Sequence, residues 1–263
     1  MKTNRIPLRG ADNARDLGGM VNASGQAITS GRFLRSNCLQ HLGRQDIALL
    51  AGEYRVARII DFRTATEVRD KPDVTIPGSQ WIHIPLLAES TFGITHETGN
   101  DQRASLLDRL PDMPDLYRHI VTDAYSLSQL KRVFLEIACE AEGAVLWHCT
   151  EGKDRCGIVT ALLLALLEVD EAAIMADYLQ TNLAAKKRAR SYFWKVFIFT
   201  RTLTKARKIR RMFLADPTYL QAAWTAIRQR HGSISAFMAA ELGMGTDQVA
   251  ALRLLAEHEP AQP

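Results

Sequence analysis

The feature that most constrains this chain is a polar loop enclosed between two strongly apolar segments. Residues 144–147 form a short uncharged run typical of a buried strand, and residues 158–169 form a leucine-rich block long enough for a buried helix. The loop between them, residues 148–155, has the sequence His-Cys-Thr-Glu-Gly-Lys-Asp-Arg. A buried strand that leads through a short loop into a helix is typical of α/β folds, in which such loops lie at the carboxyl ends of the strands.

Strand and helix patterns alternate in the rest of the first part of the chain. Apolar, β-branched runs predict strands, and amphipathic patterns predict helices, in this order: strand 31–35, helix 46–52, strand 56–61, strand 81–85, helix 115–125, helix 127–142. Beyond residue 170 nearly every pattern is helical. We therefore predict an α/β fold with a small, mostly parallel central sheet flanked by helices, in a single domain spanning 1–263.

Three further expectations concern packing and order. Trp81, Trp147 and the leucines of 158–169 are expected in the core. Residues 89–104 show no clear period and are expected to form a mobile loop. The composition, 47% hydrophobic and 24% charged over 263 residues, excludes a disordered chain.

Signals for secretion and membrane insertion are absent from the sequence. The first residues lack the apolar segment of a signal peptide, and the longest uncharged apolar run, 156–167, is shorter than the ~20 residues that span a bilayer. The four cysteines have irregular spacing and form no Cys-x-x-Cys pair, so neither a disulfide framework nor a zinc site is indicated. We expect a cytoplasmic protein, and the sequence leaves export by an unsigned route open.

The loop at 148–155 combines a nucleophile with an anion site. Backbone N–H groups of such a loop converge on one point, and the following helix adds the partial positive charge of its N-terminus. Gly152 allows a close approach of the backbone, and the guanidinium of Arg155 can bind two phosphate oxygens. The same positive field favours the thiolate of Cys149 over its thiol, whose free pKa is about 8.5. The loop therefore predicts a phosphate pocket with a reactive sulfur in it.

The number of fixed positions decides between this interpretation and a buried structural cysteine. A lone cysteine five residues before an arginine carries little weight, because free cysteine often packs as a small hydrophobe. At about 5% per residue type, a chance match of six positions has a probability of about 10⁻⁸ per window. The six matched positions are His148, Cys149, Gly152, Lys153, Asp154 and Arg155.

The loop resembles the signature loop of cysteine-dependent phosphatases. Its Gly-Lys-Asp-Arg form is similar to that of a bacterial family of tyrosine and lipid phosphatases typified by a mycobacterial enzyme, within the dual-specificity phosphatase superfamily. Further segments fit the family pattern: 13–19, 31–36, 61–63 with 67–68, 177–179, and 232–243. The resemblance covers about residues 13–255, and it implies the cysteine-phosphatase fold with a helical lid insertion at about 180–215.

The resemblance also implies a mechanism that needs no cofactor and no metal. The Cys149 thiolate would attack phosphorus, Arg155 and the loop amides would hold the equatorial oxygens, and a general acid would protonate the leaving oxygen. The family carries its acid inside the loop, as Asp154; an upstream loop carboxylate, Asp112 or Asp115, is the alternative. The remaining loop residues expected at the phosphate site are His148, Thr150, Glu151, Gly152, Lys153 and Cys156.

Two of these loop residues have specific expectations. The ring of His148 is expected to orient the loop through hydrogen bonds and to act neither as a base nor as a metal ligand. Lys153 is expected to add positive charge at the pocket rim, either as a solvated loop lysine or in contact with the extra phosphates of a polyphosphorylated substrate. Outside the loop, the family pattern places supporting residues near the pocket: Arg15, Asp16, Arg35, Asp61 and Arg63. Asp61 is expected to pair with Arg155 or a backbone amide, or to form a structural salt bridge.

Cys156 departs from the family pattern, which has Thr or Ser directly after the arginine. That hydroxyl is thought to hydrogen-bond the thiolate and to help break down the intermediate, and a thiol is a weaker donor. Hydrolysis of the phosphoenzyme is then expected to be slowed. Two alternatives remain open: reversible oxidative pairing of Cys156 with Cys149, and simple packing at the helix start.

Residues 186–211 form a basic block with interspersed aromatics. Eleven of the 33 Lys and Arg residues lie here, without a single Asp or Glu, whereas the rest of the chain carries 22 basic and 29 acidic residues. The block fits a solvated helix with an apolar stripe, the helical lid, or a surface for anionic membrane lipids, and the last two are compatible. Nucleic-acid binding is not expected, because no recognition fold is visible.

These observations predict a protein-tyrosine-type phosphatase, a cysteine-dependent phosphoric monoester hydrolase acting on phosphorylated protein and on phosphoinositide. The alternative is a phosphate-binding interaction module with impaired turnover because of Cys156. Sulfurtransferase chemistry is a third interpretation, since rhodanese-like loops also present a cysteine, but the Lys-Asp-Arg run argues against it.

Overall fold

The central sheet is built as the alternating sequence pattern predicts. The computed structural model describes residues 4–89, 112–139 and 143–257. Within them five strands have the spatial order β1-β2-β5-β3-β4. Their bounds are β1 Arg15–Asp16, β2 Phe33–Ser36, β3 Val56–Asp61, β4 Gln80–His83 and β5 Ala144–His148. Only β1 pairs antiparallel, so the predicted small, mostly parallel sheet is confirmed.

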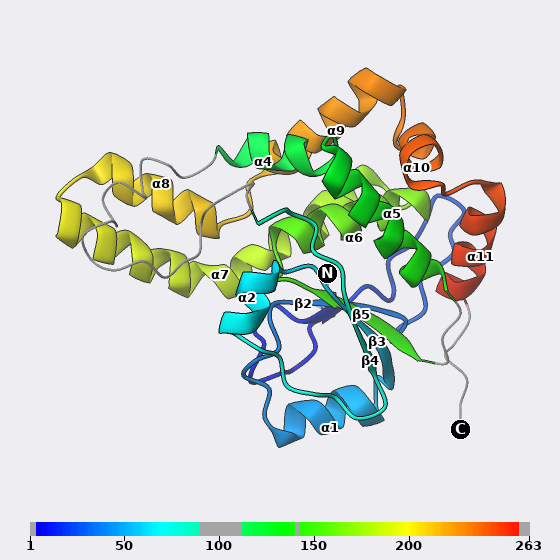
Figure 1. Ribbon diagram of the computed structural model, residues 1–263, viewed down its shortest axis with the longest axis horizontal. Helices are drawn as coiled ribbons and strands as arrows, with labels where there is room; N and C mark the ends of the chain where they lie inside the picture. The colour runs from blue at the N-terminus through cyan, green and yellow to red at the C-terminus, as the bar shows by residue number, and fades with distance from the viewer. Residues whose placement is uncertain (1–3, 90–111, 140–142, 258–263) are drawn as a thin grey trace.

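Helices cover both faces of this sheet (Figure 1). Those before the signature loop are α1 Arg44–Gly52, α2 Ala65–Asp70, α4 Met113–Ile120 and α5 Ala124–Ala138. Those after it are α6 Asp154–Leu166, α7 Glu171–Thr200, α8 Leu203–Phe213, α9 Pro217–His231, α10 Ile234–Leu242 and α11 Thr246–Glu257. None of the helices in the described ranges is both long and apolar enough to span a membrane. The segment 89–104, expected to be a mobile loop, lies outside the described residues except for Glu89.

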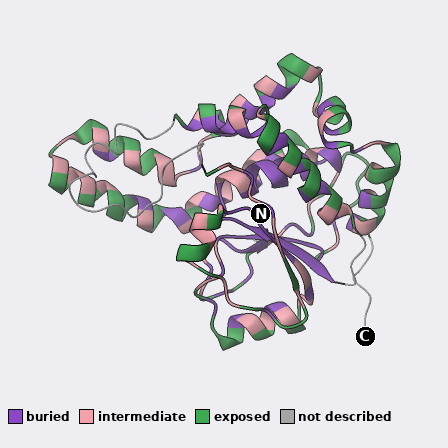
Figure 2. Cartoon of the chain, viewed as in Figure 1, coloured by how far each residue is buried: buried purple, intermediate pink, exposed green. Residues whose placement is uncertain are grey.

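The side chains of β5 show how the sheet separates two apolar cores. Ala144 and Leu146 point into the cluster that packs against α1, whereas Val145 and Trp147 point into the larger cluster formed with α4, α5, α6 and α9. This alternation follows from the period of two along a strand. All five residues of β5 are buried, as Figure 2 shows for the centre of the sheet. Residues 144–148 can therefore be apolar almost without interruption, because both faces are covered.

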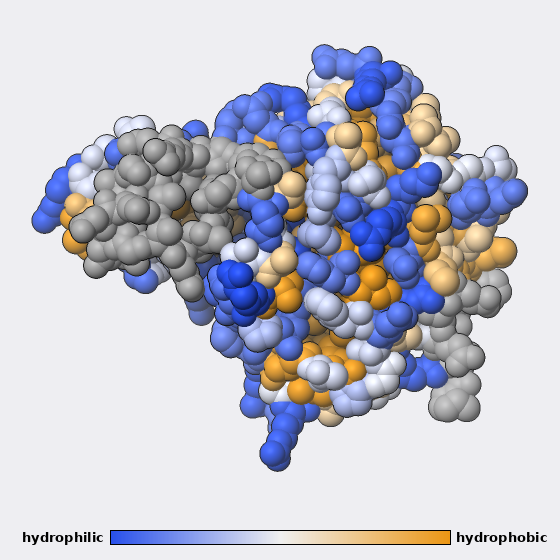
Figure 3. All heavy atoms as spheres, in the orientation of Figure 1, coloured by the Kyte–Doolittle hydropathy of each residue, from blue (hydrophilic) through white to orange (hydrophobic). Residues whose placement is uncertain are grey.

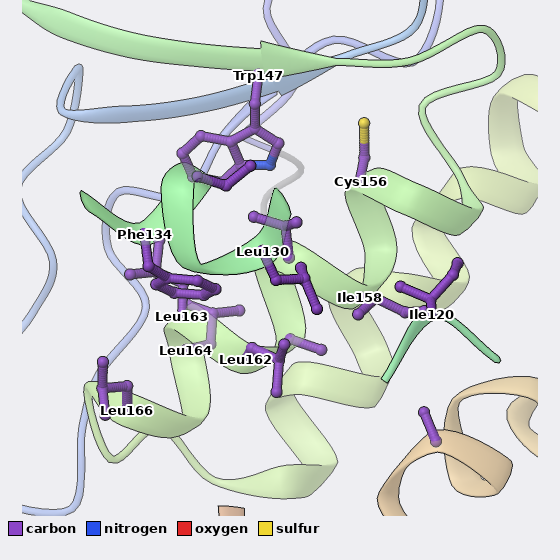
Figure 4. Packing of buried hydrophobic residues seen from close by; sticks show 14 of the residues in the cluster. Ile120, Leu130, Phe134, Trp147, Cys156, Ile158, Leu162, Leu163, Leu164 and Leu166 are labelled. Atoms are coloured by element: carbon purple, nitrogen blue, oxygen red, sulfur yellow. The ribbon is translucent and has the colours of Figure 1, made fainter. Parts of the chain in front are cut away.

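Helix α6 explains the second apolar segment of the sequence. Ten of its 13 residues are buried, and its leucines pack against α4 and α5 beneath Trp147 (Figure 4). The expectation that Trp147 and these leucines belong to the core is confirmed. The same expectation is wrong for Trp81, which is 47% exposed and stacks on His83. Trp81 lies on β4, which is an edge strand. Within the described residues β4 pairs with β3 on one side and has no strand on its other side.

The basic block of the sequence lies on a helical hairpin, which we define as residues 183–213 of α7 and α8. Helix α7 ends where Arg201 adopts the left-handed conformation, with φ 53°, and α8 then packs back against α7. The rings of Tyr192 and Phe213 stack across the pair at 4.5 Å. Figure 1 shows the hairpin extending away from the sheet. It coincides with the predicted lid at 180–215, and its closing over the site stays a prediction.

Candidate active site

The strand register places the signature loop, residues 148–155, in the middle of the sheet's carboxyl edge. His148, the last residue of β5, is in register with Ser36 at the end of β2 and with Asp61 at the end of β3. Cys149 follows directly, and α6 begins five residues later at Asp154. The strand–loop–helix unit predicted from the sequence is therefore present. It puts Cys149 and the amides of the first turn of α6 around one point.

Two side chains hold the carbonyl groups of the loop on its outer side. Asn13 Nδ2 donates to the carbonyl oxygens of Glu151 (2.9 Å) and Gly152 (3.1 Å). Arg35 Nη2 donates to the Gly152 oxygen at 2.9 Å. Gly152 itself has φ +65°, and a Cβ at this position would lie 2.6 Å from the carbonyl oxygen of Ser36. The loop therefore requires glycine here, both for its backbone conformation and for its close approach to β2.

The sulfur of Cys149 is buried and strongly activated. Burial alone would disfavour the thiolate, but hydrogen bonds from the Cys156 thiol and the Cys156 backbone N–H, together with the charge of Arg155, lower its pKa to about 6. By contrast, burial raises the pKa of Cys38 to about 11. Cys149 is therefore largely ionised at neutral pH, as a nucleophilic cysteine must be.

The thiol of Cys156 donates a hydrogen bond to the Cys149 sulfur, the role that a Thr or Ser hydroxyl has in the family pattern. Burial and the contact with Cys149 raise the pKa of Cys156 well above its usual value, so its thiol stays protonated and acts as the donor. The carbonyl oxygen of Ser36, 3.6 Å from the Cys156 sulfur, is a second acceptor for the same thiol proton. In Figure 4 the side chain points away from the leucine cluster and towards the sheet. Simple packing at the helix start therefore does not describe Cys156 fully, because its thiol contacts the Cys149 sulfur directly.

Arg155 is fixed by a residue that the sequence interpretation did not select. Its Nη1 and Nη2 donate to the two carboxylate oxygens of Glu67, at 2.6 and 2.8 Å. Burial alone would raise the pKa of Glu67. The charge and hydrogen bonds of Arg155 outweigh burial and hold this pKa well below its usual range. The hydroxyl of Thr150 donates to the same carboxylate. Within the described residues the Arg155 Nε–H has no acceptor, so it is available for a bound anion.

A local sequence signal for Glu67 existed. Thr64 and Glu67 form a capping box at the start of α2: the backbone N–H of Thr64 donates to Glu67 at 2.9 Å, and that of Glu67 donates to the Thr64 hydroxyl at 3.3 Å. The pattern Thr-x-x-Glu at the start of a helix is readable from the sequence. It predicts the helix start, however, and not the contact with Arg155.

Asp61 pairs with a backbone amide, that of Arg63 at 3.0 Å, and forms a structural salt bridge, so both of these expectations are confirmed, whereas the expected pairing with Arg155 is wrong. Its carboxylate accepts hydrogen bonds from Arg63 Nε (2.9 Å) and Nη2 (2.7 Å), because Arg63 is only two residues away and folds back over the strand end. Arg63 also bonds Asp73 at 2.5 Å. The ring of His148 lies between the two carboxylates, 3.2 Å from Asp73 and 3.9 Å from Asp61.

The four residues form a buried ion-pair network behind the loop. Burial disfavours protonation of His148, but the two carboxylates outweigh it and raise its pKa. Asp61, Asp73 and His148 also bring three potential metal ligands within 4.8 Å of one another. Arg63 already donates to both carboxylates, however, so we interpret the cluster as a support for the residue that precedes Cys149.

Lys153 does not lie at the pocket rim, and the expectation of a solvated or phosphate-contacting lysine is wrong. It is 1% exposed, and its ammonium group donates to the backbone carbonyl groups of Met212 and Leu214, after which α9 begins. The ring of Tyr219 lies 5.9 Å away. Packing of the 212–216 segment against the loop captures the lysine, which therefore ties the stem of the hairpin to the active site.

Asp154 and the two alternative acids lie in different surroundings. Asp154 is the first residue of α6 and accepts a hydrogen bond from the hydroxyl of Tyr117 at 2.7 Å. Asp112 and Asp115 lie at the start of α4 and are exposed, and Asp115 pairs with Arg118 on the surface. Among the described residues neither touches the signature loop. The geometry therefore favours Asp154 among the three.

The N-terminal supporting residues divide into two groups. Arg15 and Arg35 converge on the buried carboxylate of Asp177 in α7, with distances of 2.7 and 2.6 Å. Because Arg35 also holds the Gly152 carbonyl, this cluster links α7 to the signature loop. Asp16, by contrast, accepts hydrogen bonds from the N–H groups of Gly18 and Gly31, so it stabilises a turn away from the loop.

Glu151 connects the loop to the hairpin in a further way. Its carboxylate pairs with Arg188 of α7, which also lies 3.6 Å from Asp12. The expected loop residues are thus brought together. The side chains of Thr150 and Cys156 contact Arg155 or Cys149, and Asp154 follows them at the start of α6. The side chains of His148, Glu151 and Lys153 instead contact other parts of the protein: Asp73, Arg188 and the carbonyl groups of 212–214.

Comparisons with known proteins match most of the chain. The sequence profile of the tyrosine phosphatase family matches residues 6–255. A Cupriavidus necator protein is 30% identical over 178 residues, covering 65% of this chain and 60% of the relative. The tyrosine-protein phosphatase of Nostoc commune is 32% identical over 154 residues, covering 58% of this chain and 49% of the relative. The chain thus spans 60% of the first relative's length and about half, 49%, of the second's.

A third relative matches over nearly its whole length. The triple specificity protein phosphatase PtpB of Mycobacterium tuberculosis is 29% identical over 262 residues, covering 88% of this chain and 91% of the relative. A solved structure of P. aeruginosa TpbA in complex with pTyr covers 91% of this chain at 14% identity. Its TM-score of 0.39 is too low to add to the description of the fold.

Proposed function

The chain belongs to the tyrosine phosphatase family, and from this premise we propose that it hydrolyses phosphate monoesters of the phosphotyrosine type through a phosphocysteine intermediate. The observation that supports this most directly is the buried Cys149 sulfur, whose pKa is lowered to about 6 beside the guanidinium of Arg155. An ionised sulfur and a fixed cation in one loop suit nucleophilic attack on a dianionic phosphate.

The first chemical step transfers the phosphoryl group to the enzyme. The Cys149 sulfur forms a bond to phosphorus while the bond from phosphorus to the leaving oxygen breaks. Arg155 and the loop amides hold the three equatorial oxygens, and Glu67 keeps the guanidinium in place. Asp154 gives its proton to the leaving oxygen. In the second step a water oxygen bonds to phosphorus, the sulfur–phosphorus bond breaks, and the proton of the water goes to Asp154.

Hydrolysis of a small aryl phosphate tests the proposal. Wild type should hydrolyse the aryl phosphate, and Cys149→Ser should abolish turnover. Cys38→Ser, which changes a second thiol that is only partly buried, should retain turnover. A wild-type protein that binds phosphate tightly but shows no turnover would instead favour a binding module.

The step limited by Cys156 can be tested separately. A thiol is a weaker donor than a hydroxyl, so breakdown of the phosphocysteine is proposed to be the slow step. A pre-steady-state burst of phenol release should then appear, and Cys156→Thr should reduce the burst and raise the steady-state rate. A wild type without a burst, together with a Cys156→Thr rate equal to wild type, would contradict this.

Two features support a lipid substrate at an anionic membrane. Large apolar side chains are exposed on the hairpin and beside it: Leu183, Tyr192, Trp194, Ile198, Phe199 and Leu203. One face of α7 combines apolar and basic side chains, because residues spaced by three or four lie on the same side of a helix. Its members are Leu183, Lys187, Arg190, Trp194 and Ile198. On the face that Figure 3 shows, hydrophobic atoms appear at the outer end of the hairpin. Exposed aromatics beside basic side chains suit phosphoinositide-containing bilayers.

Vesicle co-sedimentation tests this surface. The protein should sediment with vesicles of phosphatidylcholine and phosphatidylinositol phosphate more than with phosphatidylcholine alone. The double change Trp194→Ala and Ile198→Ala should weaken binding, whereas Leu135→Ala, which removes an equally exposed side chain from α5, should not. Equal sedimentation with both vesicle types would contradict an anionic preference. Rates on phosphotyrosine peptide, phosphoserine peptide and phosphoinositide, measured side by side, then rank the substrates.

A further inference from the structure

Two buried tyrosines from different helices bring their hydroxyl groups to the carboxylate of Asp154. Tyr117 of α4 donates to Asp154 Oδ1 at 2.7 Å, and the hydroxyl of Tyr178 in α7 lies 2.7 Å from that of Tyr117. The two tyrosines are 0% and 1% exposed, and their rings meet edge to face with centroids 6.1 Å apart. The hydroxyl groups and the carboxylate thus form a continuous chain in the protein interior.

The direction of the hydrogen bonds follows from the number of protons. Tyr117 has one hydroxyl proton, which it donates to Asp154 Oδ1, so Tyr178 is the donor to Tyr117. A donor that itself accepts a hydrogen bond is polarised and donates more strongly. Burial and the neighbouring Asp154 raise the pKa of both tyrosines well above their usual value, so both hydroxyls remain protonated over the working range of the enzyme.

The ring of Tyr178 packs closely against α6. A Cβ on Gly157, one turn into α6, would lie 3.0 Å from the ring of Tyr178. Glycine at this position therefore lets the tyrosine lie flat against the helix that carries Asp154. Because Tyr117 and Tyr178 come from the helices on either side, the position of the carboxylate depends on the packing of α4, α6 and α7 together.

We propose that Tyr117, supported by Tyr178, is the positioning residue for Asp154, which holds Oδ1 so that Oδ2 carries the proton towards the leaving oxygen. This inference rests on the proposed function.

Other charged and titratable groups near Asp154 come from the signature loop and from α9. Lys153 Nζ lies 3.4 Å from Asp154 Oδ1. Cys149 in the loop and Tyr219 in α9 interact with Asp154 electrostatically. All three are unchanged by removal of the Tyr117 hydroxyl, so a difference between wild type and Tyr117→Phe reports that hydroxyl.

The test compares kcat/KM, which reports phosphoryl transfer to Cys149, for two substrates: phenyl phosphate, whose leaving group needs a proton, and p-nitrophenyl phosphate, whose leaving group needs it much less. In Tyr117→Phe, kcat/KM for phenyl phosphate should fall about tenfold more than kcat/KM for p-nitrophenyl phosphate. Tyr178→Phe should give a smaller difference in the same direction. Tyr125→Phe, a change of an exposed tyrosine in α5, should match wild type.

The outcomes separate this inference from the proposed function. Absence of turnover in wild type would overturn the proposed function. An Asp154→Asn variant whose ratio of kcat/KM values for the two substrates equals that of wild type would overturn Asp154 as the acid, and the role of Tyr117 with it. If Asp154→Asn changes this ratio while Tyr117→Phe and Tyr178→Phe leave it at the wild-type value, the positioning role is refuted. Should Tyr117→Phe fail to fold, the ratio for Tyr178→Phe decides alone.

Discussion

Replacement of Glu67 by glutamine removes the charge that fixes Arg155. Breaking a buried ion pair costs about 3–5 kcal/mol when one charge is left unpaired. The side chains of Glu67 and Arg155 are 22% and 13% exposed, so water screens part of this loss. The glutamine oxygen can still accept from the backbone N–H of Thr64. We therefore expect Glu67→Gln to lower the free energy of unfolding at pH 7 by roughly 2–3 kcal/mol.

The pH dependence of this difference tests its electrostatic origin. The pKa of Glu67 is lowered in the folded state, so its contribution is complete above the unfolded pKa of about 4.3 and declines as the pH falls below that value. Urea denaturation of wild type and Glu67→Gln at pH 7, 5 and about 3 should therefore give a gap that is constant between pH 7 and 5 and smaller at pH 3. Glu53→Gln, at an exposed site after α1, is the control and should change stability by less than about 0.5 kcal/mol.

Activity provides a second measurement of the same change. An Arg155 guanidinium without its partner samples other orientations, so kcat/KM for an aryl phosphate should fall about 10- to 100-fold, equivalent to about 1.4–2.7 kcal/mol. A gap in unfolding free energy that is the same at pH 7 and pH 3 would refute the charge-based reasoning. So would unchanged kcat/KM, because the guanidinium would then be held by other contacts.

Three further predictions follow from the loop and its supports. Alkylation of Cys149 by iodoacetamide should reach half its maximal rate near pH 6, because its pKa is lowered to about 6; a midpoint above pH 8 would exclude an activated thiolate. Asp177→Asn leaves two buried arginines without their shared carboxylate, so it should lower the free energy of unfolding by about 3–5 kcal/mol, whereas Asp115→Asn on the surface should have little effect. Gly152→Ala places a Cβ 2.6 Å from a carbonyl oxygen at φ +65°, so calorimetry should show loss of inorganic phosphate binding; retention of wild-type affinity, as expected for Gly25→Ala, would contradict the required loop shape.

The sequence by itself determined the chemistry that is local along the chain. Cys149, Gly152, Asp154 and Arg155 belong to one short strand–loop–helix unit, so their spacing alone predicts a nucleophile and an anion site at a helix start. The alternation of apolar strands and helices predicted the parallel sheet for a similar reason, because the periods of strands and helices are local.

Tertiary structure decided which partners these groups meet. Glu67 rather than Asp61 reaches Arg155, because the register of β3 against β5 brings the start of α2 over the loop while Arg63 neutralises Asp61. Lys153 is buried by carbonyl groups about 60 residues further along the chain, and Tyr117 reaches Asp154 from a separate helix. Trp81 is exposed because β4 ends the sheet. Such contacts depend on how elements far apart in sequence pack against one another, and the residues near each group in the sequence do not specify that packing.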